Sequence, residues 1–210
     1  HQEPLLITSS HLMRRGDRFL ELLNEADPYD LVILDEAHYA RRRGVSGNQP
    51  KGPNKLLNLM QELKKKTQGL VLLTATPMQV SPIEVWDLLN LLGLPPEWDV
   101  ESFQRFFDYA NHDNPSPAQF EYLARLFRAV ETYFGPMPLE DFRKYFPNLG
   151  NLALKKIVKA LQDEAQAPRR SLNSDRRRIA LQIMRRNTPI QRLISRHTRE
   201  LLRKYYEAGK

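Results

Sequence analysis

The sequence predicts an α/β fold in which a parallel sheet is followed by a largely α-helical region. Two short apolar runs, residues 31–34 and 70–73, have the composition of strands that are buried on both faces of a parallel sheet. Residues 55–67 lie between them and carry leucines and a methionine at helical spacing. A strand, a crossover helix and a second strand form a right-handed βαβ unit, which places the two strands side by side.

Polar residues follow both predicted strands. Asp35 and Glu36 come after the first strand, and Thr74 and Thr76 come after the second. Ligands of open α/β sheets bind beyond the carboxyl ends of the strands. In phosphoryl transfer an Asp in this position holds Mg²⁺ against the phosphates, and the turn after the strand can point Glu36 at the attacking water. For an Asp-Glu pair taken alone, a solvated strand end is the competing interpretation.

Two motifs then resemble a known family. Asp35-Glu36-Ala37-His38 resembles the Walker B (DEAH) box of superfamily-two helicases, and Leu73-Thr74-Ala75-Thr76-Pro77 resembles their motif III. The residues of both motifs are most similar to those of Swi/Snf-type DNA-translocating ATPases, especially bacterial RapA-type relatives. Two boxes in this order and spacing form a specific signal. The resemblance implies a partial RecA-like sheet of the P-loop NTPase type, with ATP and Mg²⁺ as cofactors.

The resemblance also implies a role for each matched residue. Asp35 would coordinate Mg²⁺ through water, Glu36 would orient the attacking water, and His38 would couple this site to motif III. Thr74 and Thr76 would relay the nucleotide state to the DNA-facing side. DNA contacts are implied for motif Ib, for the basic run after the DEAH box and for a basic box near the C-terminus: Thr8, Ser9, Ser10, Arg41, Arg42, Arg43, Arg196 and Arg199.

The candidate DNA contacts have structural alternatives. Residues 4–8 have the pattern of a strand, and the hydroxyl residues after it can cap the following helix, bind a phosphate, or do both. The glycine- and proline-rich residues 44–53 after the arginine run indicate a loop. Such a basic loop can follow a DNA backbone or remain solvated.

From residue 97 onward the sequence shows helical patterns punctuated by prolines. Residues 102–110, 117–134, 139–146 and 151–166 are predicted helices, whose phenylalanines we expect to form an aromatic core. Swi/Snf-type motors carry a helical protrusion after motif III, in agreement with this pattern. We therefore expect the later part of RecA-like lobe 1 in residues 1–96, a helical insertion in 97–167, and a basic helical segment in 168–210 that leads to a second lobe.

The charge of the chain is concentrated near its C-terminus. The formal net charge is +7, yet residues 167–210 alone hold 13 Arg and Lys against three acidic residues. This asymmetry indicates a polyanionic partner such as nucleic acid, unless the arginines lie on solvated helix faces. The absence of Cys excludes disulfides and thiolate metal sites. No apolar run has membrane-spanning length, so we expect no membrane partner. The absence of Cys suits a cytosolic protein, and the resemblance to bacterial RapA-type relatives implies a cytoplasmic bacterial protein.

Two parts of such a motor are missing from the sequence. It contains no G-x-x-x-x-G-K-[ST] motif to hold phosphates, and no second lobe. The chain also opens at His1 rather than Met. We therefore expect a piece of a longer protein, whose partners would be duplex DNA, the remainder of the same polypeptide and other proteins of a complex. Alone, this piece is not expected to hydrolyse ATP.

The predicted function is thus part of an ATP-dependent DNA translocase that couples Mg-ATP hydrolysis to movement on duplex DNA. One alternative is a non-catalytic module that binds nucleic acid or protein on a RecA-like scaffold. The arginine-rich C-terminal segment favours that alternative, whereas the intact Asp35-Glu36 pair opposes it. A second alternative is an RNA helicase of the same superfamily.

Overall fold

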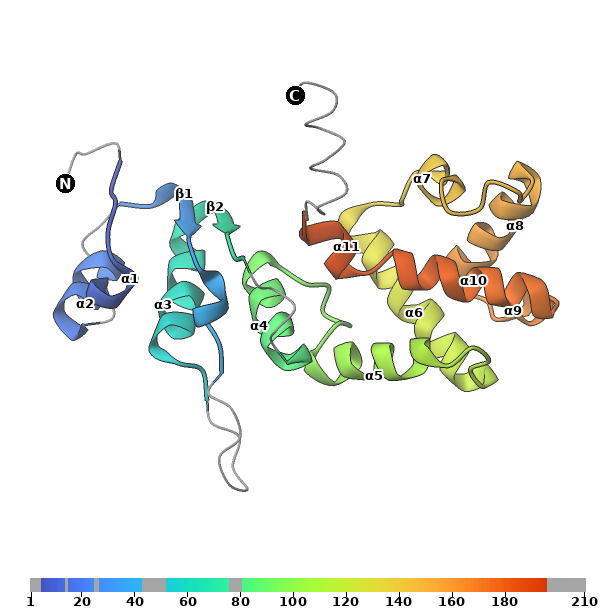
Figure 1. The fold of residues 1–210 in the computed structure, drawn as a ribbon, viewed down its shortest axis with the longest axis horizontal. Coiled ribbons are helices and arrows are strands. Elements are labelled where there is room, and N and C mark those ends of the chain that lie inside the picture. The colour runs from blue at the N-terminus through green and yellow to red at the C-terminus, as the bar shows by residue number, and fades with distance from the viewer. Residues whose placement is uncertain (1–4, 14, 25–26, 43–51, 76–80, 196–210) are drawn as a thin grey trace. The chain divides into compact units, whose positions relative to one another are not determined.

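The computed structural model describes residues 5–13, 15–24, 27–42, 52–75 and 81–195 (Figure 1). The chain divides into two compact units, His1–Leu94 and Pro95–Lys210, which we describe separately. Within the described residues, no helix combines the length and the apolar character that crossing a membrane requires.

The first unit contains the predicted βαβ arrangement. Along the chain this unit has strand β1 (Tyr29–Leu34), helix α3 (Lys55–Leu63), the short 3-10 helix η2 (Lys64–Lys66) and strand β2 (Thr67–Leu72). The two strands pair in parallel, with Leu34 opposite Leu72. Helix α3 begins where the Asn54 side chain accepts the Leu57 N–H at 2.8 Å. This part of the predicted fold is confirmed.

Helix α3 covers one face of the strand pair, and the hydrophobic core of the unit lies there. Val32 and Leu34 of β1, with Leu70 and Leu72 of β2, belong to this core, together with the buried leucines and methionine of α3. The prediction that the strands are buried on both faces is wrong for the described residues. Side chains alternate along a strand, so the opposite face carries four exposed apolar residues: Leu31, Ile33, Val71 and Leu73.

The strand predicted at residues 4–8 is also absent. Residues 5–9 have no regular structure, and Leu5, Leu6 and Ile7 are largely exposed. A strand requires a hydrogen-bonding neighbour, and β1 and β2 pair only with each other in the described sheet. Residue 4 lies outside the described residues. Two helices follow: α1 (Ser10–Met13) and α2 (Gly16–Asn24).

Helix α4 (Pro82–Leu92) completes the first unit. Ser81 and Glu84 form a capping box, with Pro82 at the first helical position. The helix ends at Gly93, which has a φ of 109° that a glycine adopts readily. Helix α4 contacts β2 and the short turn that follows β1.

The described part of the second unit is helical, as predicted. Its core is built from aromatic side chains, and the Trp98 indole N–H donates to the Leu126 carbonyl at 3.1 Å. Helix α10 packs against α6 and α8, so residues beyond the predicted boundary at 167–168 share this core. The helices are α5 (Val100–Asn111), α6 (Pro117–Phe134), α7 (Leu139–Arg143), α8 (Asn151–Gln162), α9 (Ala167–Arg170), α10 (Ser174–Arg186) and α11 (Pro189–Leu193).

Arg169 is a buried polar centre of this helical unit. Its guanidinium donates to the Glu121 carboxylate at 2.8 Å and to the carbonyls of Ala160 and Asp163. Only 1% of the residue is exposed. These bonds satisfy carbonyls at and beyond the C-terminal end of α8, where no further helical turn could do so. Arg169 therefore stabilises the helical unit from within.

Candidate functional site

The carboxyl ends of β1 and β2 are joined by hydrogen bonds that extend past the strands. The Leu73 N–H donates to the Leu34 carbonyl at 2.9 Å, and the Ala37 N–H donates to the Leu73 carbonyl at 2.8 Å. These bonds place Asp35 and Glu36 beside Thr74, as the βαβ prediction requires. Thr76 lies outside the described residues.

Glu36 has a backbone conformation that turns the chain away from the strand direction. Its φ of 51° and ψ of 46° lie in the left-handed region, and it is the one non-glycine residue with positive φ among those described. The Asp35 carboxylate accepts the Glu36 N–H at 2.8 Å. Left-handed conformations of ordinary residues cost about 1–3 kcal/mol and concentrate at functional sites. The turn re-aims the Glu36 side chain, as expected from the sequence.

His38 lies between the two motifs. It belongs to the 3-10 turn η1 (Ala37–Tyr39), and its Nδ1 is 3.1 Å from the Thr74 Oγ1 and 3.1 Å from the Glu36 Oε2. A protonated Nδ1 donates to either oxygen, whereas an unprotonated Nδ1 accepts from the Thr74 hydroxyl. The ring nitrogen therefore lies within 3.1 Å of both the Glu36 carboxylate and the Thr74 hydroxyl.

Two of the candidate DNA-binding arginines bond to helix α4. The Arg42 Nε donates to both carboxylate oxygens of Asp87, at 2.9 and 3.1 Å, and its guanidinium lies 5.4 Å from the centre of the Trp86 ring. Burial raises the pKa of Asp87, and the hydrogen bond and charge of Arg42 oppose that rise. Arg41 lies 3.7 Å from the Glu84 carboxylate. Arg42 thus already has a carboxylate partner within the fold.

The other candidate DNA contacts are placed only in part. Thr8 and Ser9 are exposed, and the Ser9 hydroxyl accepts the His11 N–H at 3.3 Å beside helix α1, which begins at Ser10. The capping interpretation therefore has a hydrogen bond to support it. Arg43, Arg196 and Arg199 lie outside the described residues.

Comparison with known proteins places the chain in a family. A family model described as the SNF2-related domain matches residues 1–168. The chain belongs to this family. The resemblance read from the DEAH-type box and motif III is confirmed, and the SNF2-related match extends over both the strand pair and helices α5–α8.

Relatives of this SNF2-related chain include several bacterial proteins named RNA polymerase-associated protein RapA. The protein from Vibrio cholerae is 31% identical over 102 residues, which are 49% of this chain and 10% of the relative. The protein from Erwinia tasmaniensis is 30% identical over 113 residues, which are 54% of this chain and 11% of the relative. The chain thus spans about a tenth of the length of these relatives. No solved structure matches it.

Two contributors to the site in this SNF2-related chain were missed by the sequence analysis. Asp87 anchors Arg42, and the Asn54 amide donates to the Tyr39 carbonyl at 2.6 Å while its oxygen caps α3. Both residues hold the segment that follows the DEAH-type box. Asp87 could have been found, because a carboxylate among the leucines of a predicted helix is a buried charge that needs a partner.

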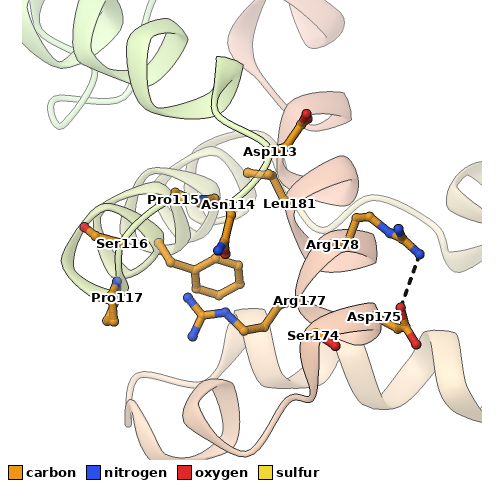
Figure 2. A pocket seen from close by; sticks show the side chains of 11 residues that line it. Asp113, Asn114, Pro115, Ser116, Pro117, Ser174, Asp175, Arg177, Arg178 and Leu181 are labelled. Carbon is orange, nitrogen blue, oxygen red and sulfur yellow. Dashed lines mark hydrogen bonds and ion pairs between the residues drawn. The ribbon is translucent and has the colours of Figure 1, made fainter.

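The second unit contains a separate hollow of about 650 Å³, between the start of α6 and helix α10. In Figure 2, Asn114 and Arg177 point into this space, whereas Arg178 turns to Asp175, with which it pairs at 3.2 Å. The Arg177 guanidinium stacks 4.5 Å from the centre of the Phe120 ring. The lining mixes cations, carboxylates and apolar groups, and none of the sequence-predicted site residues contributes to it.

Proposed function

We propose that this chain is the later part of the first RecA-like lobe, with its helical insertion, of an ATP-dependent DNA translocase of the Swi/Snf type. The observation that carries the proposal is the hydrogen-bonded contact of Glu36, His38 and Thr74 at the carboxyl ends of two parallel strands. Ligands bind at this edge of α/β sheets, and the contact links the two motifs that identify the family.

The residues at this edge fit a magnesium nucleotide. The described residues contain no group of three or more His, Asp or Glu side chains that could hold a metal, and this edge offers the exposed carboxylates of Asp35 and Glu36. Mg²⁺ is commonly held by one or two carboxylates together with waters and substrate phosphates. When bound, it would neutralise charge on the phosphates. Asp35 would hold it, and Glu36 would orient water for attack.

His38 and Thr74 would then couple the nucleotide site to DNA. A change in what the Glu36 carboxylate contacts alters the partner available to the His38 Nδ1, and hence the orientation of the Thr74 hydroxyl. Thr76 would continue this relay. Thr8, Ser9, Ser10 and Arg41 are the proposed contacts with DNA phosphates near this unit, and Arg42 would first have to leave Asp87.

The open face of the strand pair supports the proposal that further sheet and helix complete this lobe. Leu31 and Ile33 are 52% and 57% exposed, and Val71 and Leu73 lie on the same face. Contiguous exposed apolar residues mark a surface that another segment covers. The phosphate-binding loop and the second lobe would belong to the remaining polypeptide, so this chain alone would not hydrolyse ATP.

A binding module is the second candidate, favoured by the charge of the helical region. Residues 151–210 hold 16 Lys and Arg against five acidic residues. In that case nucleic acid would bind without any contribution from Glu36.

The experiment that tests the motor is ATP hydrolysis by a full-length protein containing this segment, with and without duplex DNA. Glu36→Gln should reduce the DNA-stimulated rate at least about 100-fold, since a residue that positions or activates the nucleophile contributes factors of this size. Asp30→Asn is the matched control, because Asp30 is an exposed acid at the opposite end of β1. A Glu36→Gln rate equal to wild type would refute the motor and favour the binding module, and stronger stimulation by RNA would favour the RNA helicase.

A further inference from the structure

Helix α8 presents a row of lysines to solvent. Lys155, Lys156 and Lys159 are exposed, whereas Leu154, Ile157 and Leu161 are buried against the unit. Lys159 follows Lys156 by three residues and Lys155 by four, so the three lysines lie on one side of the helix. We call this surface the lysine face. Figure 1 shows α8 near α7 and α10, and α8 also contacts α6 and α9.

The lysine face carries positive charge without compensation. Helix α8 contains no acidic residue, and none of its three lysines has an ion pair or hydrogen bond in the described structure. The nearest acids in sequence, Asp163 and Glu164, follow the helix, and Asp163 accepts the Ala165 N–H. Like charges three and four residues apart repel one another on a helix. Other exposed lysines do have partners: Lys65 pairs with Glu62, and Lys144 pairs with Asp141.

Acidic residues predominate in the first part of the second unit, and basic residues predominate from α8 onward. Residues 95–150 hold five basic and nine acidic residues, whereas residues 151–210 hold 16 basic and five acidic residues. A surface of one sign attracts a partner of the opposite sign over a distance and raises its association rate. The positive half begins at α8.

The chemistry of the lysine face favours nucleic acid over an acidic protein. Protein interfaces are depleted in lysine and enriched in tryptophan, tyrosine and arginine, none of which occurs in α8. Phosphate backbones, by contrast, are bound by Lys and Arg as point charges. Lys155 and Lys159 are separated by about 6 Å of helix, and duplex DNA presents about three to four phosphate charges over that length.

We infer that the lysine face is a contact site for the phosphate backbone of duplex DNA, distinct from the residues at the carboxyl ends of β1 and β2. It binds without sequence preference, because contacts of lysines with phosphates carry no sequence information. The inference rests on the proposed function only in naming DNA as the polyanion. Its test contains no ATP, so a failure of the ATPase proposal leaves the result unchanged.

The test is the salt dependence of binding of the 210-residue chain to a fluorescent 30-base-pair duplex. The variant is Lys155→Gln, Lys156→Gln and Lys159→Gln together, since Gln matches Lys in helix propensity. Loss of three phosphate contacts should reduce the slope of log affinity against log salt by about 2.7. The loss of affinity between 50 and 200 mM salt should then be about 40-fold smaller than in the wild type, as the same slope change implies.

The matched control removes three positive charges that already have carboxylate partners. Lys65→Gln, Arg105→Gln and Lys144→Gln together change the net charge equally, and all three residues are exposed in ion pairs. This control should change the slope by less than one. A slope in the lysine-face variant equal to that of the wild type or of the control would overturn the inference. So would equal loss of binding to polyglutamate and DNA, which would indicate a general anion surface. Circular dichroism verifies that both variants remain helical.

Discussion

Replacing Arg42 by Ala should destabilise the first unit more than replacing its partner Asp87 by Ala. The Arg42 Nε donates to both carboxylate oxygens of Asp87, at 2.9 and 3.1 Å, but the surroundings of the two residues differ. The Asp87 side chain is 2% exposed, whereas that of Arg42 is 38% exposed. Removing Arg42 leaves a buried carboxylate without its cation, while removing Asp87 leaves an arginine that can turn to water.

The expected magnitudes follow from this asymmetry. Breaking a buried ion pair costs about 3–5 kcal/mol, and the exposure of Arg42 places Arg42→Ala near the lower limit, at about 3 kcal/mol. Asp87→Ala should cost about 1 kcal/mol, the size of an ordinary hydrogen bond. Asp87 can also become neutral, because burial raises its pKa and the opposing Arg42 charge is gone. The cost of Arg42→Ala should therefore shrink as the pH falls.

Hydrogen exchange measured by mass spectrometry on peptides from α4 is the assay. The core helix α6 of the second unit supplies an internal control, because Arg42 and Asp87 both belong to the first unit. Exchange in α4 should accelerate about 100-fold in Arg42→Ala, as a stability loss of about 3 kcal/mol implies. If Asp87→Ala accelerates exchange as much as Arg42→Ala, the argument from burial is refuted. A double-mutant cycle measures the coupling directly.

Three further changes test the packing of the two units. Burial raises the pKa of Glu131 above its ordinary 4.5, so the folded chain binds this proton more tightly than the unfolded chain and loses stability as the pH rises above 4.5. Glu131→Gln should remove this pH dependence in urea titrations from pH 4.5 to 7, and an unchanged profile would contradict the prediction. Arg169→Met should lower the free energy of unfolding by about 3–5 kcal/mol in thermal unfolding, since it leaves buried carbonyls and the Glu121 carboxylate without their donor. A loss below about 1 kcal/mol would show that these groups find other partners. On the open face, Ile33→Thr should lower the free energy of unfolding by less than about 1 kcal/mol, whereas Leu34→Ala in the core should lower it by about 2–4 kcal/mol. Equal losses in denaturant titration would show that the open face is covered.

The strand pair was predictable because its signals are local. Apolar runs of strand length and the helical spacing of Leu56, Leu59 and Leu63 depend only on neighbouring residues. Right-handed crossover then leaves one parallel arrangement for the two strands. The same reasoning predicts that Asp35, Glu36 and Thr74 lie at one edge of the sheet.

The predictions that failed depended on partners distant in sequence. Leu5, Leu6 and Ile7 have strand composition, but composition alone supplies no neighbouring strand to complete their hydrogen bonds. Burial of Leu31 and Ile33 likewise required a layer on the second face of the sheet, which the described residues do not provide. Apolar sequence shows that a residue is suited to burial, while burial itself is decided by what packs on it.

The amino-acid sequence by itself determined the family motifs, the strand–helix–strand unit and the helical character of residues beyond 97, because each is written in short-range patterns. Tertiary structure alone decided that the His38 Nδ1 lies 3.1 Å from both Glu36 and Thr74. It also decided that Arg42 bonds to Asp87 and that three lysines of α8 have no ion-pair partner among the residues that the structure describes. His38 and Thr74, like Arg42 and Asp87, are tens of positions apart in the sequence, and only the packing of the folded chain brings them into contact.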